Sequence, residues 1–232
     1  MTGVKVTESS MAVSSNGTEV TTFLVEPDDA VALMVLGHGS GTPAHYPLMV
    51  EMAEALADQR IATFRYNFPY SEGMTSYDPN EIDTLDVLLA TTRTARAAAG
   101  SLSLDLPLFF GGRSMSSQVV SLAMSQEHWS DIHGVALYVF PMRWQVLLED
   151  TVGHLPQVPA PMLFVQGGRD EEYANVQELQ TVLDNLDGRA SLHVVEGADH
   201  DYDLPPESGR TRSDALKEVA AVTAKWVQNT LR

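Results

Sequence analysis

Short apolar segments alternate with amphipathic segments along almost the whole chain, and this alternation constrains the fold more than any other feature. Six segments have the length and apolar content of buried strands: residues 30–36, 61–66, 106–110, 133–140, 161–166 and 191–195. Apolar residues at helical spacing follow most of them, beginning at Pro47, after Pro79, after Ser114, at 176–186 and at 216–227. This order predicts an α/β fold with a mostly parallel sheet and helices on both faces.

Three local patterns refine this prediction. Residues 18–26 are rich in β-branched residues, and Asn16-Gly17 suits a tight turn that would pair them with residues 11–14. Asp78, Pro79 and Glu81 together are typical of a helix start, so the second helix is expected to begin there. Residues 141–161 have no clear periodicity, and we expect at most one short helix in them, at 145–149.

Composition and charge exclude several classes of protein. The 232 residues contain no repeat and no linker-like segment, so one domain over 1–232 is expected. A net charge of −17 argues against a nucleic-acid partner. No apolar run is long enough to span a membrane and no signal peptide is visible, so the expected location is the cytoplasm. The absence of cysteine excludes disulfides and a thiol nucleophile.

One of the predicted strand-to-helix junctions carries a serine between small residues. The apolar segment 106–110 leads into Gly112-Arg113-Ser114-Met115-Ser116, and apolar residues at helical spacing follow. A serine on such a sharp turn projects its hydroxyl beyond the sheet, where the first N–H groups of the next helix also point. The pattern is close to Gly-x-Ser-x-Gly, with Ser116 in place of the second glycine. Ser114 is therefore the predicted nucleophile.

A nucleophilic serine requires a base, and the base requires a carboxylate that orients it. His200 follows the last predicted strand and Asp170 follows the strand before it. Both are expected at the same edge of the sheet as Ser114, because parallel strands end together there. Other carboxylates nearby remain as alternatives to Asp170: Glu171, Asp199, Asp201 and Asp203.

The glycine-rich segment 37–41 follows the first central strand and is expected to stabilise an oxyanion. Two N–H donors are needed for the oxyanion of a tetrahedral intermediate. We expect one from Met115, directly after the nucleophile, and the other from Ser40, with Gly39 as the alternative. The segment lacks Gly-x-Gly-x-x-Gly spacing and the chain has no Gly-Lys-Ser/Thr motif, so no nucleotide-binding loop is expected.

Five segments together resemble a compact group of α/β hydrolases close to the dienelactone hydrolases: residues 37–41, 64–70, 111–115, 166–170 and 197–200. The chain is also similar to the hydrolase-like domain of a histone-acetyltransferase-complex subunit. The resemblance implies an α/β-hydrolase fold with a minimal lid, and Ser114, Asp170 and His200 as its catalytic triad. Dienelactone hydrolases proper use a cysteine nucleophile, which this chain lacks, and the group usually has glycine at position 116.

Several side chains near the strand ends are candidates for binding substrate. Four arginines lie at or just beyond strand ends: Arg65, Arg113, Arg143 and Arg169. Arg65 and Arg143, with the loop aromatics Tyr70 and Trp144, are the candidates for contact with an acyl substrate that bears a carboxylate. The competing interpretation is that the arginines form structural ion pairs.

Together these patterns predict a serine hydrolase of the carboxylesterase type that cleaves a small ester or related acyl bond. The predicted partner is a small-molecule acyl substrate, and neither a cofactor nor a metal is expected, since no His-Glu-x-x-His pattern occurs. The alternative is a non-catalytic protein that uses the same fold as an interaction surface. Thioester or peptide cleavage is a third possibility. The oligomeric state cannot be read from these residues.

Overall fold

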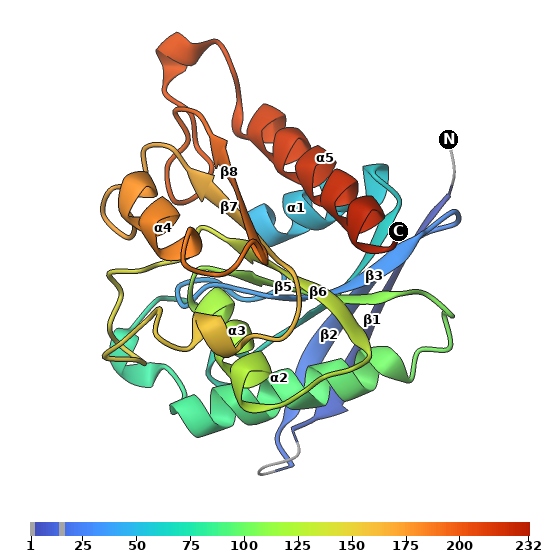
Figure 1. Cartoon of the computed structure of the whole chain (residues 1–232). Helices are drawn as coiled ribbons and strands as arrows, with labels where there is room; N and C mark the ends of the chain where they lie inside the picture. Colours follow the sequence, from blue (N-terminus) through green and yellow to red (C-terminus); the bar gives the residue numbers. More distant parts are fainter. Residues whose placement is uncertain (1–2, 14–16) are drawn as a thin grey trace.

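The computed structural model describes residues 3–13 and 17–232, which form one eight-stranded sheet and the helices that cover it (Figure 1). The strands are β1 Val4–Ala12, β2 Glu19–Pro27, β3 Ala32–Gly37, β4 Ile61–Tyr66, β5 Leu108–Arg113, β6 Ile132–Tyr138, β7 Met162–Gly167 and β8 Ala190–Val195. The helices are α1 Pro47–Asp58, α2 Leu85–Gly100, α3 Met115–Gln126, α4 Val176–Leu183 and α5 Arg212–Thr230. The predicted fold class is confirmed.

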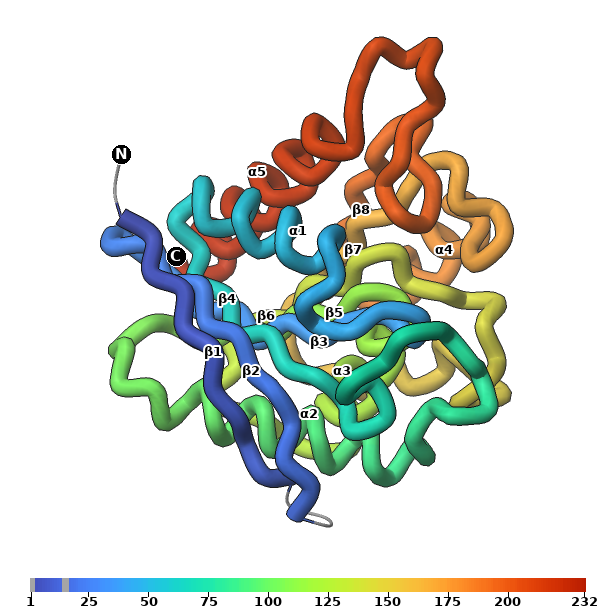
Figure 2. The backbone as a smooth tube through the Cα atoms, turned by 180° about the vertical axis from the view of Figure 1, so that it is seen from behind, coloured from blue at the N-terminus to red at the C-terminus, as the bar shows by residue number. Residues whose placement is uncertain are grey.

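The sheet is parallel except at one edge. Its strand order is β1-β2-β4-β3-β5-β6-β7-β8, and every pair from β4 to β8 is parallel. β1 and β2 are antiparallel to each other, and β2 runs antiparallel to β4; they lie together at one margin of the molecule (Figure 2). The predicted pairing of residues 11–14 is seen in β1 as far as Ala12, while Ser14–Asn16 of its turn lie outside the described residues.

Helices cover both faces of the sheet because successive residues of each buried strand point to opposite sides. Met34 and Leu36 of β3 pack in a core with apolar residues of α1 and α5. Leu33 and Val35 of the same strand face a second core, formed with α2, α3 and α4. Figure 1 shows α1 and α5 above the sheet and α2 and α3 below it. All six residues of β3 are buried, as expected of a central strand.

Two local predictions are wrong. Asp78 caps a 3-10 turn, Pro79–Glu81, instead of the second helix: its carboxylate accepts the Asn80 N–H at 2.8 Å. The chain then becomes extended at Ile82, and α2 begins three residues later, at Leu85.

Residues 145–149 do not form the expected short helix. The residues just before them in the connection from β6 to β7 are held by a side chain of α3: the Gln118 amide donates to the Pro141 and Trp144 carbonyls at 2.8 and 3.2 Å. The connection contains a single 3-10 turn, Leu155–Gln157, so it provides only a minimal lid over the edge of the sheet. Among the helices of the described residues, none has the length and hydropathy needed to cross a bilayer.

Candidate active site

Ser114 lies at a strained turn between β5 and α3. Its φ of 52° and ψ of −120° place a residue with a side chain in the left-handed region, which costs about 1–3 kcal/mol. Backbone hydrogen bonds hold the turn: the Ser114 N–H donates to the Tyr138 carbonyl at 2.9 Å, and the Ser117 N–H donates to the Ser114 carbonyl at 2.8 Å. A Cβ on Gly112 would lie 2.5 Å from the Ser116 carbonyl oxygen, so glycine is required there.

Ser116, which replaces the usual glycine of this turn, fits because a glycine faces it. A Cβ on Gly37 would lie 2.7 Å from the Ser116 Cβ and 2.8 Å from its Oγ, so β3 leaves the space that this side chain occupies. The Ser116 hydroxyl accepts the Arg113 N–H at 3.0 Å and lies 3.1 Å from the Arg113 carbonyl, to which it donates. Compared with glycine at this position, Ser116 therefore adds two hydrogen bonds to the turn.

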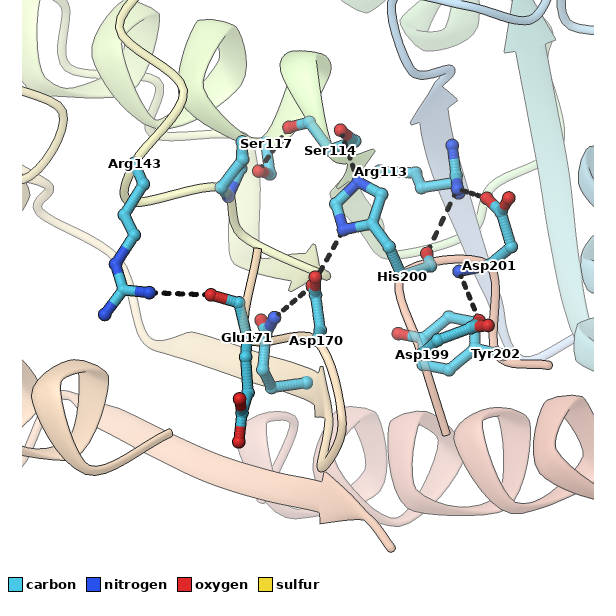
Figure 3. Close-up of polar contacts among 12 residues, drawn as sticks. Arg113, Ser114, Ser117, Arg143, Asp170, Glu171, Asp199, His200, Asp201 and Tyr202 are labelled. Carbon is cyan, nitrogen blue, oxygen red and sulfur yellow. Dashed lines mark hydrogen bonds and ion pairs between the residues drawn. The ribbon is translucent and has the colours of Figure 1, made fainter. Parts of the chain in front are cut away.

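Ser114, His200 and Asp170 form a continuous chain of hydrogen bonds (Figure 3). The Ser114 Oγ lies 2.8 Å from His200 Nε2, and His200 Nδ1 lies 2.7 Å from Asp170 Oδ2. The three side chains come from the ends of β5, β8 and β7, which the parallel sheet brings to one edge. The Asp170 side chain is 1% exposed, whereas that of His200 is 18% exposed and reaches solvent. This arrangement can carry a proton from the serine to the imidazole.

Asp170 has a second partner that the sequence analysis missed. The Gln166 side chain, buried at the end of β7, donates its amide to Asp170 Oδ2 at 2.7 Å. This contact fixes the carboxylate that faces the imidazole. No residue spacing indicated this contact. Tyr173 was also missed: its ring covers His200, with centroids 4.1 Å apart and planes tilted by 30°.

Three of the four alternative carboxylates, all except Glu171, have other partners. Asp199 accepts the N–H groups of Asp201 and Asp203 at 3.0 and 2.9 Å. Asp201 pairs with Arg113, and Asp203 lies 3.4 Å from the Arg212 guanidinium. Within the described chain, Asp170 is the carboxylate that His200 contacts.

Backbone donors for an oxyanion are present on both sides of Ser114. Met115 is the first residue of α3, so its N–H has no acceptor within the helix. In the described part of the chain, neither Ser40 nor Gly39 has an acceptor for its N–H. The Tyr70 hydroxyl donates to the Ser40 carbonyl at 2.9 Å and so holds this peptide segment in place.

His38 fixes the same loop as a neutral residue. It is fully buried, and this burial lowers the pKa of its imidazole to about 4. Nδ1 donates to the Gly39 carbonyl at 2.7 Å, and Nε2 accepts the Phe68 N–H at 3.2 Å. Since one nitrogen donates and the other accepts, the neutral form satisfies both contacts. The ring thereby ties the loop after β3 to the loop after β4.

A cavity of about 330 Å³ opens beside the serine and the histidine. It is lined by Ser40, Gly41, Thr42, Tyr77, Arg113, Ser114, Trp144, Tyr173, His200 and Asp201. Of the four predicted substrate-binding residues, Trp144 is in this lining and Arg65, Tyr70 and Arg143 are not. Tyr77 is a lining residue that the sequence analysis did not single out.

The arginines near the strand ends are held by groups of the protein itself. Arg65 is buried, donates to the Ala44 carbonyl at 2.6 Å and lies over the Phe23 ring; burial lowers its pKa to about 10. Arg143 donates to the Glu171 carbonyl at 2.6 Å and pairs with Glu178 at 2.8 Å, pointing away from Ser114 (Figure 3).

Arg113 connects three loops of the site. Its Nη2 donates to the His200 carbonyl at 3.1 Å and to the Asp201 carboxylate. Its Nη1 lies against Gly39, where a Cβ would come within 2.6 Å of it. The side chain is only 5% exposed, and burial lowers the pKa of the guanidinium while Asp201 opposes that shift.

No cluster of three or more potential metal ligands occurs within residues 3–13 and 17–232.

Comparison with known proteins agrees with this fold. Residues 30–228 match the model of the alpha/beta hydrolase domain family, and the chain belongs to that family.

Among curated proteins, a Mycobacterium tuberculosis protein whose name proposes a phosphoribosyl transferase is 26% identical over 208 residues. The match covers 88% of this chain and 42% of that protein, so the chain spans less than half of its curated relative. The two proteins share this region, and the relative's name describes the longer molecule.

Two solved structures illustrate the shared fold. Est1E from Butyrivibrio proteoclasticus superposes with a TM-score of 0.71 at 15% identity, covering 96% of this chain and 98% of that one. A dienelactone hydrolase from Anabaena variabilis gives 0.69 at 20% identity, covering 97% and 98%. The expected resemblance to dienelactone hydrolases is thus confirmed at the level of fold.

Proposed function

We propose that this protein is a serine hydrolase that cleaves an ester of a small acyl group. The observation that carries the proposal is the unbroken contact from Ser114 Oγ through the His200 imidazole to Asp170, at 2.8 and 2.7 Å. The hydrolase family to which the chain belongs and the fold shared with a dienelactone hydrolase support it.

The proposed reaction begins with attack of Ser114 Oγ on the substrate carbonyl carbon. The serine proton passes to His200 Nε2, and Asp170 stabilises the resulting imidazolium through Nδ1. The carbonyl oxygen becomes an oxyanion that accepts hydrogen bonds from the N–H groups of Met115 and Ser40, or Gly39. Nε2 then protonates the leaving alcohol, and an acyl-serine remains.

Water completes the proposed cycle by the same route. His200 takes a proton from the water, whose oxygen attacks the acyl-serine carbonyl. When the second tetrahedral intermediate collapses, Nε2 returns the proton to Ser114 Oγ and the carboxylic acid leaves. The cycle consumes one ester and one water, and it uses only side chains and backbone groups of this chain.

The decisive experiment compares ester hydrolysis by two serine variants. Ser114→Ala should lower kcat for p-nitrophenyl acetate by at least about 10³-fold, because the serine acts as a unit with its base. The matched control is Ser125→Ala on α3, where the hydroxyl donates to the Leu122 carbonyl and the residue does not line the cavity; it should keep full activity.

A fluorophosphonate probe gives an independent measurement. It should label the native protein at Ser114 and leave Ser114→Ala unlabelled. Equal turnover by Ser114→Ala would refute the proposed mechanism. Hydrolysis confined to thioesters or amides would keep the mechanism and change the substrate class.

A further inference from the structure

The two proposed oxyanion donors come from different segments of the chain, so their spacing has to be held by other groups. Met115 begins α3, whereas Ser40 lies in the loop after β3. An oxyanion gains from both N–H groups only when each lies within hydrogen-bond distance of the same oxygen. A group that contacts both residues can set that spacing, and the Tyr70 side chain is such a group.

Tyr70 contacts both donor residues through its hydroxyl. The hydroxyl donates to the Ser40 carbonyl at 2.9 Å, and its oxygen lies 3.8 Å from the Met115 sulfur. Tyr70 is not among the residues that line the cavity at Ser114, although Ser40 is. The hydroxyl therefore acts on the loop and on α3 from outside the cavity, and it does not contact a substrate bound there.

The direction of the Ser40 N–H is fixed by hydrogen bonds to two successive peptide groups. The carbonyl of the Gly39–Ser40 peptide accepts from His38 Nδ1 at 2.7 Å. The N–H of the same trans peptide points the opposite way, so this contact sets its direction. The next carbonyl, that of Ser40, accepts from Tyr70. A rotation of Ser40 would therefore break one of these two hydrogen bonds.

Tyr70 is itself held by several groups. Its N–H donates to the Asp83 carboxylate at 2.9 Å. Its ring is stacked on the Phe68 ring, with centroids 6.3 Å apart and planes inclined by 16°, and its centroid lies 6.1 Å from that of His38. Burial raises the pKa of the Tyr70 hydroxyl above its usual range, so the hydroxyl keeps its proton and remains a donor.

We propose that Tyr70 is a positioning residue for the oxyanion site, holding the N–H groups of Ser40 and Met115 at the spacing that the transition state requires. The inference rests on the proposed function and adds to it a residue that acts on the transition state without touching the substrate. Because the oxyanion forms only when Ser114 attacks, loss of the hydroxyl should weaken binding of the transition state and leave binding of the substrate unchanged.

The first measurement is ester hydrolysis by Tyr70→Phe, which removes the hydroxyl and keeps the ring. Its kcat for p-nitrophenyl acetate should fall about tenfold with KM unchanged within about twofold, a smaller loss than the roughly 10²–10³-fold that follows removal of an oxyanion donor. Tyr66→Phe is the matched control, because Tyr66 is also buried and its hydroxyl lies 3.3 Å from that of Thr92 on α2. The control should retain the native kcat, and urea unfolding shows whether both variants are folded.

A pair of ketones separates positioning from a general disturbance of the site. A short alkyl trifluoromethyl ketone adds to Ser114 and forms an oxyanion, whereas the corresponding methyl ketone binds without forming one. In Tyr70→Phe, Ki of the trifluoromethyl ketone should rise by the same factor by which kcat/KM falls, and Ki of the methyl ketone should not change. A structural disturbance of the cavity would raise both inhibition constants together.

Met115→Leu tests the second contact of the hydroxyl and keeps the proposal testable if Tyr70→Phe folds poorly. It removes the sulfur and nearly preserves the volume of the side chain. It should lower kcat/KM and raise Ki of the trifluoromethyl ketone by equal factors, both smaller than those of Tyr70→Phe. The double variant should be no worse than Tyr70→Phe, because the sulfur contact is already lost with the hydroxyl.

The outcomes separate this inference from the proposed function. An unchanged Ki of the trifluoromethyl ketone in Tyr70→Phe, or an equal rise for both ketones, would overturn the positioning role and leave the proposed function intact. Fully additive effects of Tyr70→Phe and Met115→Leu would overturn the role of one hydroxyl in holding both donors. Absence of ester hydrolysis by the native protein would overturn the proposed function and this inference with it.

Discussion

At the scale of single residues, His38 shows how a buried imidazole can be structural although it lies close to a proposed catalytic site. Its Nδ1 bonds the Gly39 carbonyl and its Nε2 lies near the Phe68 N–H and the Ser71 hydroxyl; in the described residues no hydrogen bond joins it to Ser114 or His200. Because burial lowers its pKa to about 4, the folded protein holds it neutral, whereas an unfolded histidine has a pKa of about 6.5.

This difference predicts acid sensitivity. Between pH 6.5 and pH 4 the unfolded chain binds a proton at His38 that the folded chain does not, so stability falls as the pH is lowered through this window. From pH 7 to pH 5 the loss due to His38 should be about 2 kcal/mol. Urea unfolding at both pH values should show that His38→Gln, which retains a donor and an acceptor, loses about 2 kcal/mol less than the native protein. An equal loss in both would contradict the prediction.

The residues of the site differ in how far the sequence could identify them. The sequence could identify Ser114, His200 and Asp170. Each follows a predicted strand, and the carboxyl ends of parallel strands lie at the same edge of the sheet. Gln166 and Tyr173 could not be identified, because their contacts with Asp170 and His200 depend on side-chain directions that no spacing reveals.

The predicted contacts of the arginines were the least reliable part of the sequence analysis. An arginine at a strand end can turn toward a cavity or toward any nearby carbonyl. Arg65 bonds the Ala44 carbonyl and Arg143 the Glu171 carbonyl, and backbone acceptors of this kind leave no mark in a sequence.

At the scale of elements, β3 and the turn from β5 to α3 are fitted to each other through one pair of small residues. Ser116 occupies the space that Gly37 leaves, with the Tyr66 hydroxyl as the third neighbour of that space. An added methyl group at position 37 must therefore displace either the turn or the strand.

We predict that Gly37→Ala destabilises the protein by about 1–3 kcal/mol through overpacking. Adding Ser116→Gly should recover at least about 1 kcal/mol of this loss, because it removes the nearest two atoms. Adding Ser116→Ala should recover much less, since its Cβ remains 2.7 Å away. Chemical denaturation of the single and double variants measures these differences, and strictly additive effects would exclude the contact.

The sequence identified the main elements because each buried strand and helix has a distinct apolar period. The two wrong predictions lie where a contact with a residue distant in sequence outweighs the local pattern. Asp78 and Pro79 do form a cap, but it begins a short 3-10 turn instead of α2. The Asp83 carboxylate accepts the Tyr70 N–H at 2.9 Å, and the chain remains extended before α2. Residues 145–149 follow a carbonyl bound by Gln118 of α3, a contact that no local pattern indicates.

At the scale of the whole molecule, the dominant property is the net charge of −17, which arises from 31 acidic residues and only 14 lysines and arginines. The ion pairs on the surface, such as Arg60 with Asp29 and Arg143 with Glu178, are exposed and contribute little individually. The unpaired excess of carboxylates repels itself in the compact state.

Salt should therefore stabilise this protein. Raising NaCl from 20 mM to 500 mM at pH 8 should increase Tm by roughly 2–4 °C, equivalent to about 1 kcal/mol, because screening weakens the repulsion. KCl should have the same effect, and the increase should shrink at pH 5, where part of the negative charge is neutralised. A fall in Tm with salt would show that attractive pairs outweigh the repulsion.

The guanidinium of Arg113 links two loops of the site, so mutations in these loops should not act independently. It contacts the His200 carbonyl, the Asp201 carboxylate and Gly39, so one side chain supports both the proposed base and the segment of the proposed oxyanion donors. Replacing it would disturb both at once, and its kinetic effect would not add to the effects of changes at either loop. Energetic coupling between the two halves of the site is thus built into the residue that immediately precedes the serine.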